Sequence, residues 1–280
     1  MKLTNVQVSG SRVEAVGATS ATGGGGGVWG GGTDTAVVIL SSRVSGNTVQ
    51  VQAGTDTANA DGGALLGPGR MTVKRSTLDR NTVSAGSTGS DASASGAGIL
   101  TFGGPFELRE STVSRNVAWA TAQDANVASA GRGTVELETV ASALIVNSTL
   151  AANAARGFAE TGSGGGTGQA TAGGLFVGKS VLELRHATIA RNSVGGRGQT
   201  TSFVGGGLYT ALSTVNMRGV LVAENRSLSE PDCHGAVSSQ GDNLIDKLPG
   251  CVSKRRERPT SSARTRGSVG SRAGADQPRR

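Results

Sequence analysis

Acidic side chains are the groups in this chain that have the chemistry to act on a polysaccharide. Glu136 and Glu138 stand two residues apart on an expected strand, so both carboxyl groups point to one face. A glycoside hydrolase needs two carboxylates about 5 to 9 Å apart. A polysaccharide lyase needs clustered carboxylates that hold calcium, together with a basic proton acceptor.

The remaining acidic residues do not complete such a cluster. Glu107 and Glu183 share a position of a sequence repeat but lie two repeats apart, and Asp79 is the only acid at its position. We therefore assign no catalytic residue, interpret Glu136 and Glu138 as part of a solvated strand face, and keep a polysaccharide lyase or glycoside hydrolase as the alternative. The only two histidines, at 186 and 234, are far apart in the repeat, so we expect no metal site and no cofactor.

Basic residues recur at one repeat position and form a partial stripe. Val146 interrupts it, and basic residues at such a position also keep the face of a sheet soluble. We hold the stripe as a candidate surface for an acidic glycan or an envelope polymer. The basic stripe consists of Lys74, Arg109, Arg185 and Arg218.

A repeat that ends on asparagine organises nearly the whole chain. The pentapeptide at 77–81 returns at 112–116, 149–153 and 188–192, with looser copies that end at Asn47, Asn225 and, with serine in place of asparagine, Ser11. The anchors are separated by 36, 34, 35, 37, 39 and 33 residues. A constant register with a variable period indicates one structural unit repeated, with loops of different length inserted at one place.

Apolar residues stand at fixed distances before each anchor. Three and eight residues before it every position is aliphatic or methionine, and polar residues lie between these columns. This alternation indicates β-strands, and 46 glycines in 280 residues argue against helices. We expect the following side chains to point inward and to pack on their equivalents one repeat away: Leu108, Val113, Ile145, Leu150, Leu184 and Ile189.

A third short element, such as Gly173-Gly174-Leu175-Phe176-Val177, precedes these two strands in most repeats. Three strands per repeat, stacked on those of the next repeat, predict an all-β parallel β-helix of about seven coils. The segments 84–95 and 161–171 are rich in Ser, Ala, Gly and Thr, and we expect them to be low-complexity loops.

The repeated asparagine has a structural explanation. At a tight corner its side chain satisfies backbone groups, and stacked asparagines bond to one another along the coil axis. The alternative is a row of binding residues, but recurrence at every corner is what a repeated structure requires. The expected ladder consists of Asn47, Asn81, Asn116, Asn153, Asn192 and Asn225.

The last repeat ends on a pattern that resembles a known family. Its parts are Pro231-Asp232-Cys233, Gly241-Asp242-Asn243-Leu244-Ile245 and Gly250-Cys251. The pattern is similar to the closing coil of bacterial right-handed parallel β-helix surface proteins, whose repeats are like those of polymorphic outer-membrane proteins and belong to the pectate-lyase-like superfold. The resemblance covers about residues 1–251 and implies a right-handed single-stranded parallel β-helix that is exported. Asp242 departs from the family pattern, which usually has tyrosine or an asparagine-like residue there.

The two cysteines of the chain, Cys233 and Cys251, lie 18 residues apart within this closing pattern. The family-like context and the lack of any other cysteine favour one disulfide, and hence an oxidising compartment, over two free thiols in a cytosolic chain. Closing such a loop stabilises a fold by about 3 kcal/mol through the entropy of the unfolded chain.

Export is expected although no signal peptide and no transmembrane span are visible. Met1 and Leu3 already occupy core columns, so a coil begins at the first residue and its strand edge has no cap. We interpret the chain as a fragment or as the product of a misplaced start codon.

Charge separates the body of the chain from its C-terminal tail. Residues 252–280 carry nine basic and two acidic residues, which accounts for the net charge of +7 and leaves the body neutral. Without large apolar residues this tail is expected to be disordered and to bind polyanions weakly or to have no role, and without aromatic residues it is not expected to bind nucleic acid specifically. The expected domains are 1–228 for the repeats, 229–251 for the disulfide-closed terminal coil and 252–280 for the tail.

These observations together favour a secreted or surface-exposed protein without catalytic activity. We expect a structural, adhesin-like interaction rod whose partner is a cell-surface glycan or an envelope polymer. A carbohydrate-active enzyme on the same fold is the alternative.

Overall fold

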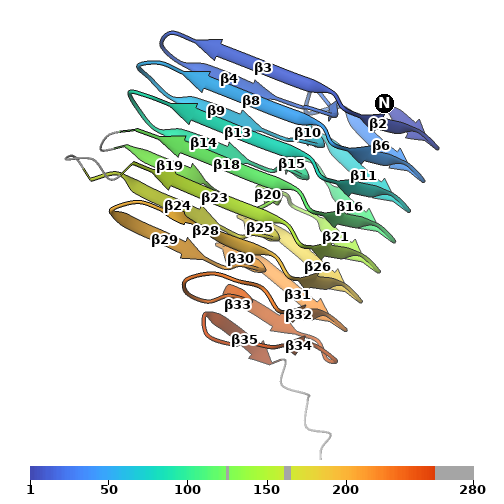
Figure 1. Ribbon diagram of the computed structural model, residues 1–280. Helices are drawn as coiled ribbons and strands as arrows, with labels where there is room; N and C mark the ends of the chain where they lie inside the picture. Colours follow the sequence, from blue (N-terminus) through green and yellow to red (C-terminus); the bar gives the residue numbers. More distant parts are fainter. Residues whose placement is uncertain (124–125, 161–164, 256–280) are drawn as a thin grey trace, which may run out of the picture.

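The regular secondary structure in the described part of the chain consists of parallel strands. The computed structural model describes residues 1–123, 126–160 and 165–255, and these residues contain 35 β-strands and no helix (Figure 1). Strands pair in parallel with the equivalent strands of neighbouring turns, so the chain is a β-solenoid. The all-β parallel β-helix expected from the sequence is confirmed.

Each complete turn contains five strands, two more than the three that the sequence predicts. The third turn is typical, and its strands define five faces, A to E, in chain order. These strands are β11 (Arg70–Lys74), β12 (Thr77–Asp79), β13 (Thr82–Ser87), β14 (Ala92–Ser95) and β15 (Ile99–Phe102).

The equivalent strands of the other turns stack above and below these five. Face A also holds β1 (Lys2–Thr4), β6 (Ala36–Leu40), β16 (Phe106–Arg109), β21 (Ala143–Val146), β26 (Val181–Arg185) and β31 (Thr214–Arg218). Face B also holds β2 (Gln7–Ser9), β7 (Arg43–Ser45), β17 (Thr112–Ser114), β22 (Thr149–Ala151), β27 (Thr188–Ala190), β32 (Leu221–Ala223) and β34 (Leu244–Ile245).

The three remaining faces have one strand for each of the six complete turns. Face C also holds β3 (Arg12–Gly17), β8 (Thr48–Ala53), β18 (Val117–Ala122), β23 (Ala154–Ala159) and β28 (Ser193–Arg197). Face D also holds β4 (Ala21–Gly24), β9 (Ala58–Asp61), β19 (Val127–Ala130), β24 (Thr167–Thr171) and β29 (Thr200–Val204). Face E also holds β5 (Val28–Trp29), β10 (Leu65–Gly67), β20 (Val135–Glu138), β25 (Leu175–Gly178) and β30 (Leu208–Ala211).

The seventh turn is incomplete, because faces C and D have only isolated bridges there, at Arg226 and Ser229, and one long strand, β33 (Cys233–Ser239), spans two faces. It pairs with β30 of face E at its start and with β31 of face A at its end. A last strand, β35 (Cys251–Arg255), pairs with β33. β35 therefore includes the first residues of the segment 252–280 that the sequence analysis assigns to a tail, because its backbone pairing with β33 extends to Arg255. Residues 256–280 lie outside the described residues.

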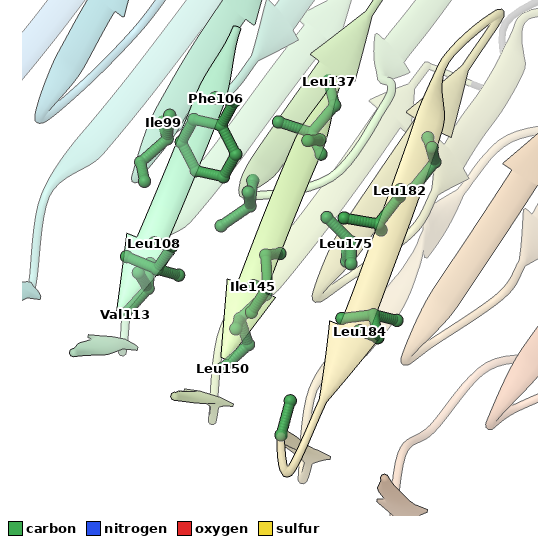
Figure 2. Close-up of a cluster of buried hydrophobic side chains, with 14 of the residues drawn as sticks. Ile99, Phe106, Leu108, Val113, Leu137, Ile145, Leu150, Leu175, Leu182 and Leu184 are labelled. Atoms are coloured by element: carbon green, nitrogen blue, oxygen red, sulfur yellow. The ribbon is translucent and has the colours of Figure 1, made fainter. Parts of the chain in front are cut away.

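Faces A, B and E enclose one hydrophobic core along the solenoid. Leu108, Ile145 and Leu184 lie in register on three successive strands of face A, and each points inward (Figure 2). All six side chains expected in the core are fully buried, which confirms the aliphatic columns read from the sequence. Because each turn buries its apolar face only against its neighbours, stability depends on continuous contact between turns.

Faces C and D enclose a second core that consists mainly of alanine. In β14, Ala92 and Ala94 point into it while Ser93 and Ser95 point outward. The expectation that 84–95 and 161–171 are loops is therefore wrong for 84–87, 92–95 and 167–171, and residues 161–164 lie outside the described residues. Alternating Ala and Ser has the period of a strand, but the small apolar contrast between them conceals it.

Candidate functional site

The asparagine column lies buried at the corner between faces B and C. Each of the six asparagines is at most 1 % exposed. Oδ1 of Asn116 accepts hydrogen bonds from the backbone N–H and from Nδ2 of Asn81, at 3.0 and 2.9 Å, and its Nδ2 donates to the carbonyl of Leu78. The same bonds connect the other members of the column. These amides are buried and bonded to one another, so the column offers no surface to a ligand.

The residue before each of these asparagines adopts a left-handed conformation. Arg80, Arg115, Ala152 and Arg191 have φ values of 56°, 56°, 56° and 58°. A residue with a Cβ is disfavoured there by about 1 to 2 kcal/mol. The buried hydrogen bonds of the column offset this cost at each turn.

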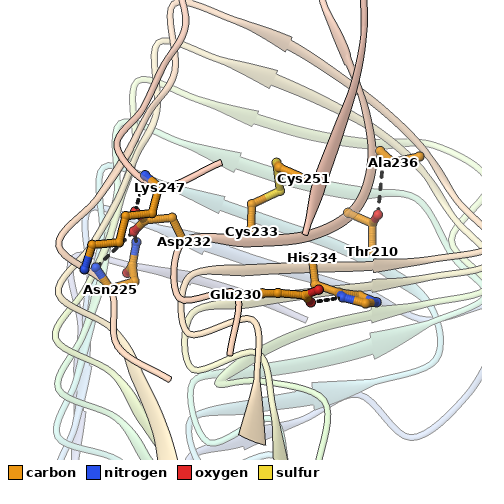
Figure 3. The surroundings of a disulfide bond; sticks show 9 residues. All are labelled: Thr210, Asn225, Glu230, Asp232, Cys233, His234, Ala236, Lys247 and Cys251. Atoms are coloured by element: carbon orange, nitrogen blue, oxygen red, sulfur yellow. Dashed lines mark hydrogen bonds and ion pairs between the residues drawn. A yellow bond between two sulfur atoms is a disulfide. The ribbon is translucent and has the colours of Figure 1, made fainter. Parts of the chain in front are cut away.

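The closing pattern of the sequence ends the asparagine column (Figure 3). Oδ1 of Asp232 accepts from the backbone N–H and Nδ2 of Asn225, at 3.1 and 2.8 Å, as an asparagine of a further turn would. Its Oδ2 accepts from the backbone N–H of Lys247 at 2.9 Å. Next to it, a disulfide joins Cys233 to Cys251, with Cα atoms 5.1 Å apart, and ties β35 to β33.

The basic stripe lies on the outer side of face A, where neighbouring glutamates neutralise much of its charge. Glu107 pairs with both Lys74, at 2.9 Å, and Arg109. Glu183 pairs with Arg185 at 3.3 Å. The structure thus brings Glu107 and Glu183 into the stripe as partners of its cations. The stripe is an alternating-charge surface, which weakens the case for a site that attracts anions.

Asp79 is fully buried on face B beneath three arginines. Arg43 Nη2 lies 2.8 Å from Oδ1 and 2.9 Å from Oδ2, and only the contact to Oδ2 has hydrogen-bond geometry. Arg115 and Arg80 approach Oδ2 at 3.3 and 3.7 Å. The guanidinium groups compensate the buried carboxylate, so Asp79 has a structural role.

Faces D and E meet in a groove on the outer surface of the solenoid, which we call the D/E groove. Two adjoining pockets form it and share Ser93, Ser95 and Arg132. The groove crosses turns two to six, a length of about 19 Å at the spacing of stacked strands. Face D contributes one register column of hydroxyl and amide side chains, Asn59, Ser93, Ser129 and Gln169.

Face E contributes a column that is apolar or aromatic except at one position. Its members in register are Trp29, Leu66, Leu100, Glu136, Phe176, Tyr209 and His234. The rings of Phe176 and Tyr209 stack at 5.5 Å, and those of Tyr209 and His234 at 4.4 Å. Glu136 therefore interrupts a continuous apolar column, and this interruption is the sequence signal that could have identified the groove.

A cluster of three carboxyl groups and one guanidinium lies at the centre of the D/E groove. Arg132 Nη1 is 3.6 Å from Glu136 Oε1 and 3.6 Å from Glu138 Oε2. Asp61 lines the same pocket. The Cζ atom of Arg132 lies 5.8 Å from the centre of the Phe176 ring. The sequence interpretation of Glu136 as part of a solvated face is wrong, because Glu136 is only 3 % exposed.

Burial changes the acidity of two members of this cluster. Burial raises the pKa of Glu136 to about 8, against the attraction of Arg132. Burial also raises the pKa of Asp61 to about 6, again against Arg132. At neutral pH Glu136 therefore carries its proton.

The buried carboxyl predicts a characteristic dependence of stability on pH. The unfolded chain loses the Glu136 proton near pH 4.5, whereas the folded protein keeps it until about pH 8. The free energy of unfolding should therefore fall as the pH rises through this interval, by on the order of 5 kcal/mol, and level off above it.

Denaturant unfolding of the wild type and of Glu136→Gln at pH 5 and pH 8 measures this effect. The neutral glutamine does not titrate, so the variant should lose much less stability between the two pH values and be the more stable protein at pH 8. Asp61 contributes in the same direction below pH 6 in both proteins. Parallel pH profiles for the two proteins would show that Glu136 is not a buried acid.

The described residues contain neither a metal-binding cluster nor a membrane-spanning helix. Among them, no group of three His, Cys, Asp or Glu side chains is placed to hold a metal ion. No helix in this part of the chain has the length and apolarity needed to cross a membrane.

Comparisons with family models, curated proteins and solved structures found no match, so a functional assignment rests on the geometry of the D/E groove and on its residues.

Proposed function

We propose that the protein is a secreted or surface-exposed rod that binds an extended glycan of a cell surface or envelope in the D/E groove, without cleaving it. The observation that carries the proposal is the groove itself, which presents hydroxyl, amide, carboxyl and aromatic side chains over five successive turns. Sugars offer many hydroxyl groups and apolar ring faces, and such a surface matches both.

The periodicity of the fold supports a polymer as the ligand. Equivalent side chains recur along the groove at about 4.8 Å, so a chain molecule laid parallel to the axis meets a similar surface at each turn. The groove replaces the basic stripe as the proposed contact, because glutamates pair with most of the cations of the stripe.

The closing segment supports export. The disulfide between Cys233 and Cys251 is of a kind that persists in oxidising compartments. The resemblance of this segment to bacterial parallel β-helix surface proteins with repeats like those of polymorphic outer-membrane proteins points to the same location.

A glycan array probed with three forms of the protein tests the proposal. Ser129→Trp places a large outward side chain in the middle of the groove, and we expect it to reduce binding at least tenfold. The matched double variant Arg109→Gln, Arg185→Gln removes charge from the stripe and should bind as the wild type does. The proposal fails if no glycan binds, or if the stripe variant loses binding while Ser129→Trp retains it.

A glycoside hydrolase is the second candidate, and one observation favours it. Glu136 holds its proton at neutral pH beside Glu138 and Asp61, and a protonated carboxyl next to an ionised one is the arrangement of an acid–base pair. Mass spectrometry of bound oligosaccharides after prolonged incubation decides between the candidates. Shorter products that disappear with Glu136→Gln would establish the hydrolase, and intact ligand supports binding alone.

A further inference from the structure

The carboxyl cluster of the D/E groove has more hydrogen-bond acceptors than its neighbours use. Arg132 is the only basic residue among the described residues that line either pocket, and its contacts with Glu136 and Glu138 are both long, at 3.6 Å. In the part of the chain that the structure describes, Asp61 makes no ion pair and no side-chain hydrogen bond. Three carboxyl groups thus face one guanidinium.

Glu136 shows most clearly that a partner is missing. Its Oε2 atom is buried and has no hydrogen-bond partner within the described residues. The side chain lines the pocket together with Asp61 and Glu138. A buried acceptor without a partner is unfavourable, so a ligand whose donor reaches this atom on binding recovers free energy.

We propose that this cluster is a subsite for the primary ammonium group of an amino sugar, so that the glycan of the groove is one with unacetylated amines. The inference rests on the proposed function and names its ligand class. An ammonium group carries three donors on one compact positive charge, which suits a pocket that is lined by Asp61, Glu136 and Glu138 and has a single basic residue among the described residues of its lining.

The hydroxyl groups around the cluster fit the rest of such a sugar. Ser93 and Ser95 line both pockets, and Phe102, which is 41 % exposed, adds an apolar surface to one of them. A bound ammonium adds positive charge beside Glu136 and so favours the ionised form of that carboxyl. Residues 1–251 have no net charge, so non-specific electrostatics contribute little to the binding of a cationic ligand there and a measured preference reports the site.

Calorimetry with two matched oligosaccharides at pH 6 tests the proposal on the full chain. The probes are the hexamer of glucosamine and the hexamer of N-acetylglucosamine, which differ only in whether their amines are free. We expect the wild type to bind the glucosamine hexamer at least tenfold more tightly. Glu138→Gln and Asp61→Asn, both isosteric, should reduce this ratio to about threefold or less. Glu183→Gln removes a carboxylate from face A, outside the groove, and should preserve the ratio.

The outcomes separate this inference from the proposed function. Equal affinity for the two hexamers would overturn the amine subsite and leave a neutral-glycan groove in place. A preference that survives both groove substitutions, or that Glu183→Gln abolishes, would also overturn it. If the protein binds other glycans on the array but neither hexamer, the amine subsite is contradicted and the proposed function stands. If it binds no glycan at all, the proposed function is contradicted as well.

Discussion

Leu184→Asp is expected to prevent folding or to reduce the free energy of unfolding by about 5 kcal/mol or more. Leu184 is fully buried on β26, between Ile145 of the preceding turn and Met217 of the next. An aspartate at this position places an unpaired charge in a core that has no partner for it. Since each turn is supported only by its neighbours, the defect interrupts the solenoid between its fifth and seventh turns.

Chemical denaturation of the variant and of a neighbouring control measures this effect. Arg185→Gln changes an outward side chain in the same strand. Its free energy of unfolding should differ from that of the wild type by no more than about 0.5 kcal/mol. If Leu184→Asp does not fold, Leu184→Ala keeps the prediction measurable, with an expected loss of about 2 to 5 kcal/mol. An unchanged midpoint for either Leu184 variant would mean that the register of face A is wrong.

Asn116→Ala is expected to cost about 3 to 5 kcal/mol, although it removes no apolar surface from the main core. The substitution deprives the backbone N–H and Nδ2 of Asn81 of their acceptor, and it deprives the Leu78 carbonyl of a donor. Each buried polar group that loses its partner contributes about 1 to 3 kcal/mol. The effect should therefore exceed that of an ordinary surface substitution severalfold.

Thermal and denaturant unfolding of Asn116→Ala can be compared with that of Thr112→Val. Thr112 points outward from β17, four residues earlier, and its replacement should change stability by no more than about 0.5 kcal/mol. Asn116→Asp separates the two roles of the amide, because the carboxylate still accepts from Asn81 but does not donate to Leu78. Equal stability of Asn116→Ala and Thr112→Val would remove the asparagine column from the account of the fold.

The main core was predictable because large aliphatic residues mark it. Leu108, Ile145 and Leu184 recur at one distance from an asparagine, and Met217 is the only member of that column that is not aliphatic. The alanine core was missed for the opposite reason, since residues such as Ala92 and Ala94 differ little in hydrophobicity from the serines between them. The Ser- and Ala-rich composition of this segment suggested a loop, whereas its alternation with a period of two indicates a strand.

The candidate site was only partly predictable. Glu136 and Glu138 stand out in the sequence as a pair, but the burial of Glu136 depends on Leu100 and Phe176, which flank it from the turns on either side. Arg132 joins the cluster from the short connection between β19 and β20. The contacts of Glu136 with Leu100 and Phe176 follow from the register between turns, which becomes visible for face E only when all its strands are aligned.

Oxidative footprinting with a bound glycan tests most directly whether the D/E groove is the binding surface. Hydroxyl radicals modify exposed aromatic side chains, and Phe102 in the groove and Trp119 on face C are similarly exposed, at 41 % and 42 %. With the tightest-binding oligosaccharide of the array at saturation, modification of Phe102 and Tyr209 should fall severalfold while that of Trp119 stays unchanged. Protection of Trp119 without protection of Phe102 and Tyr209 would contradict the account and move the ligand to another face.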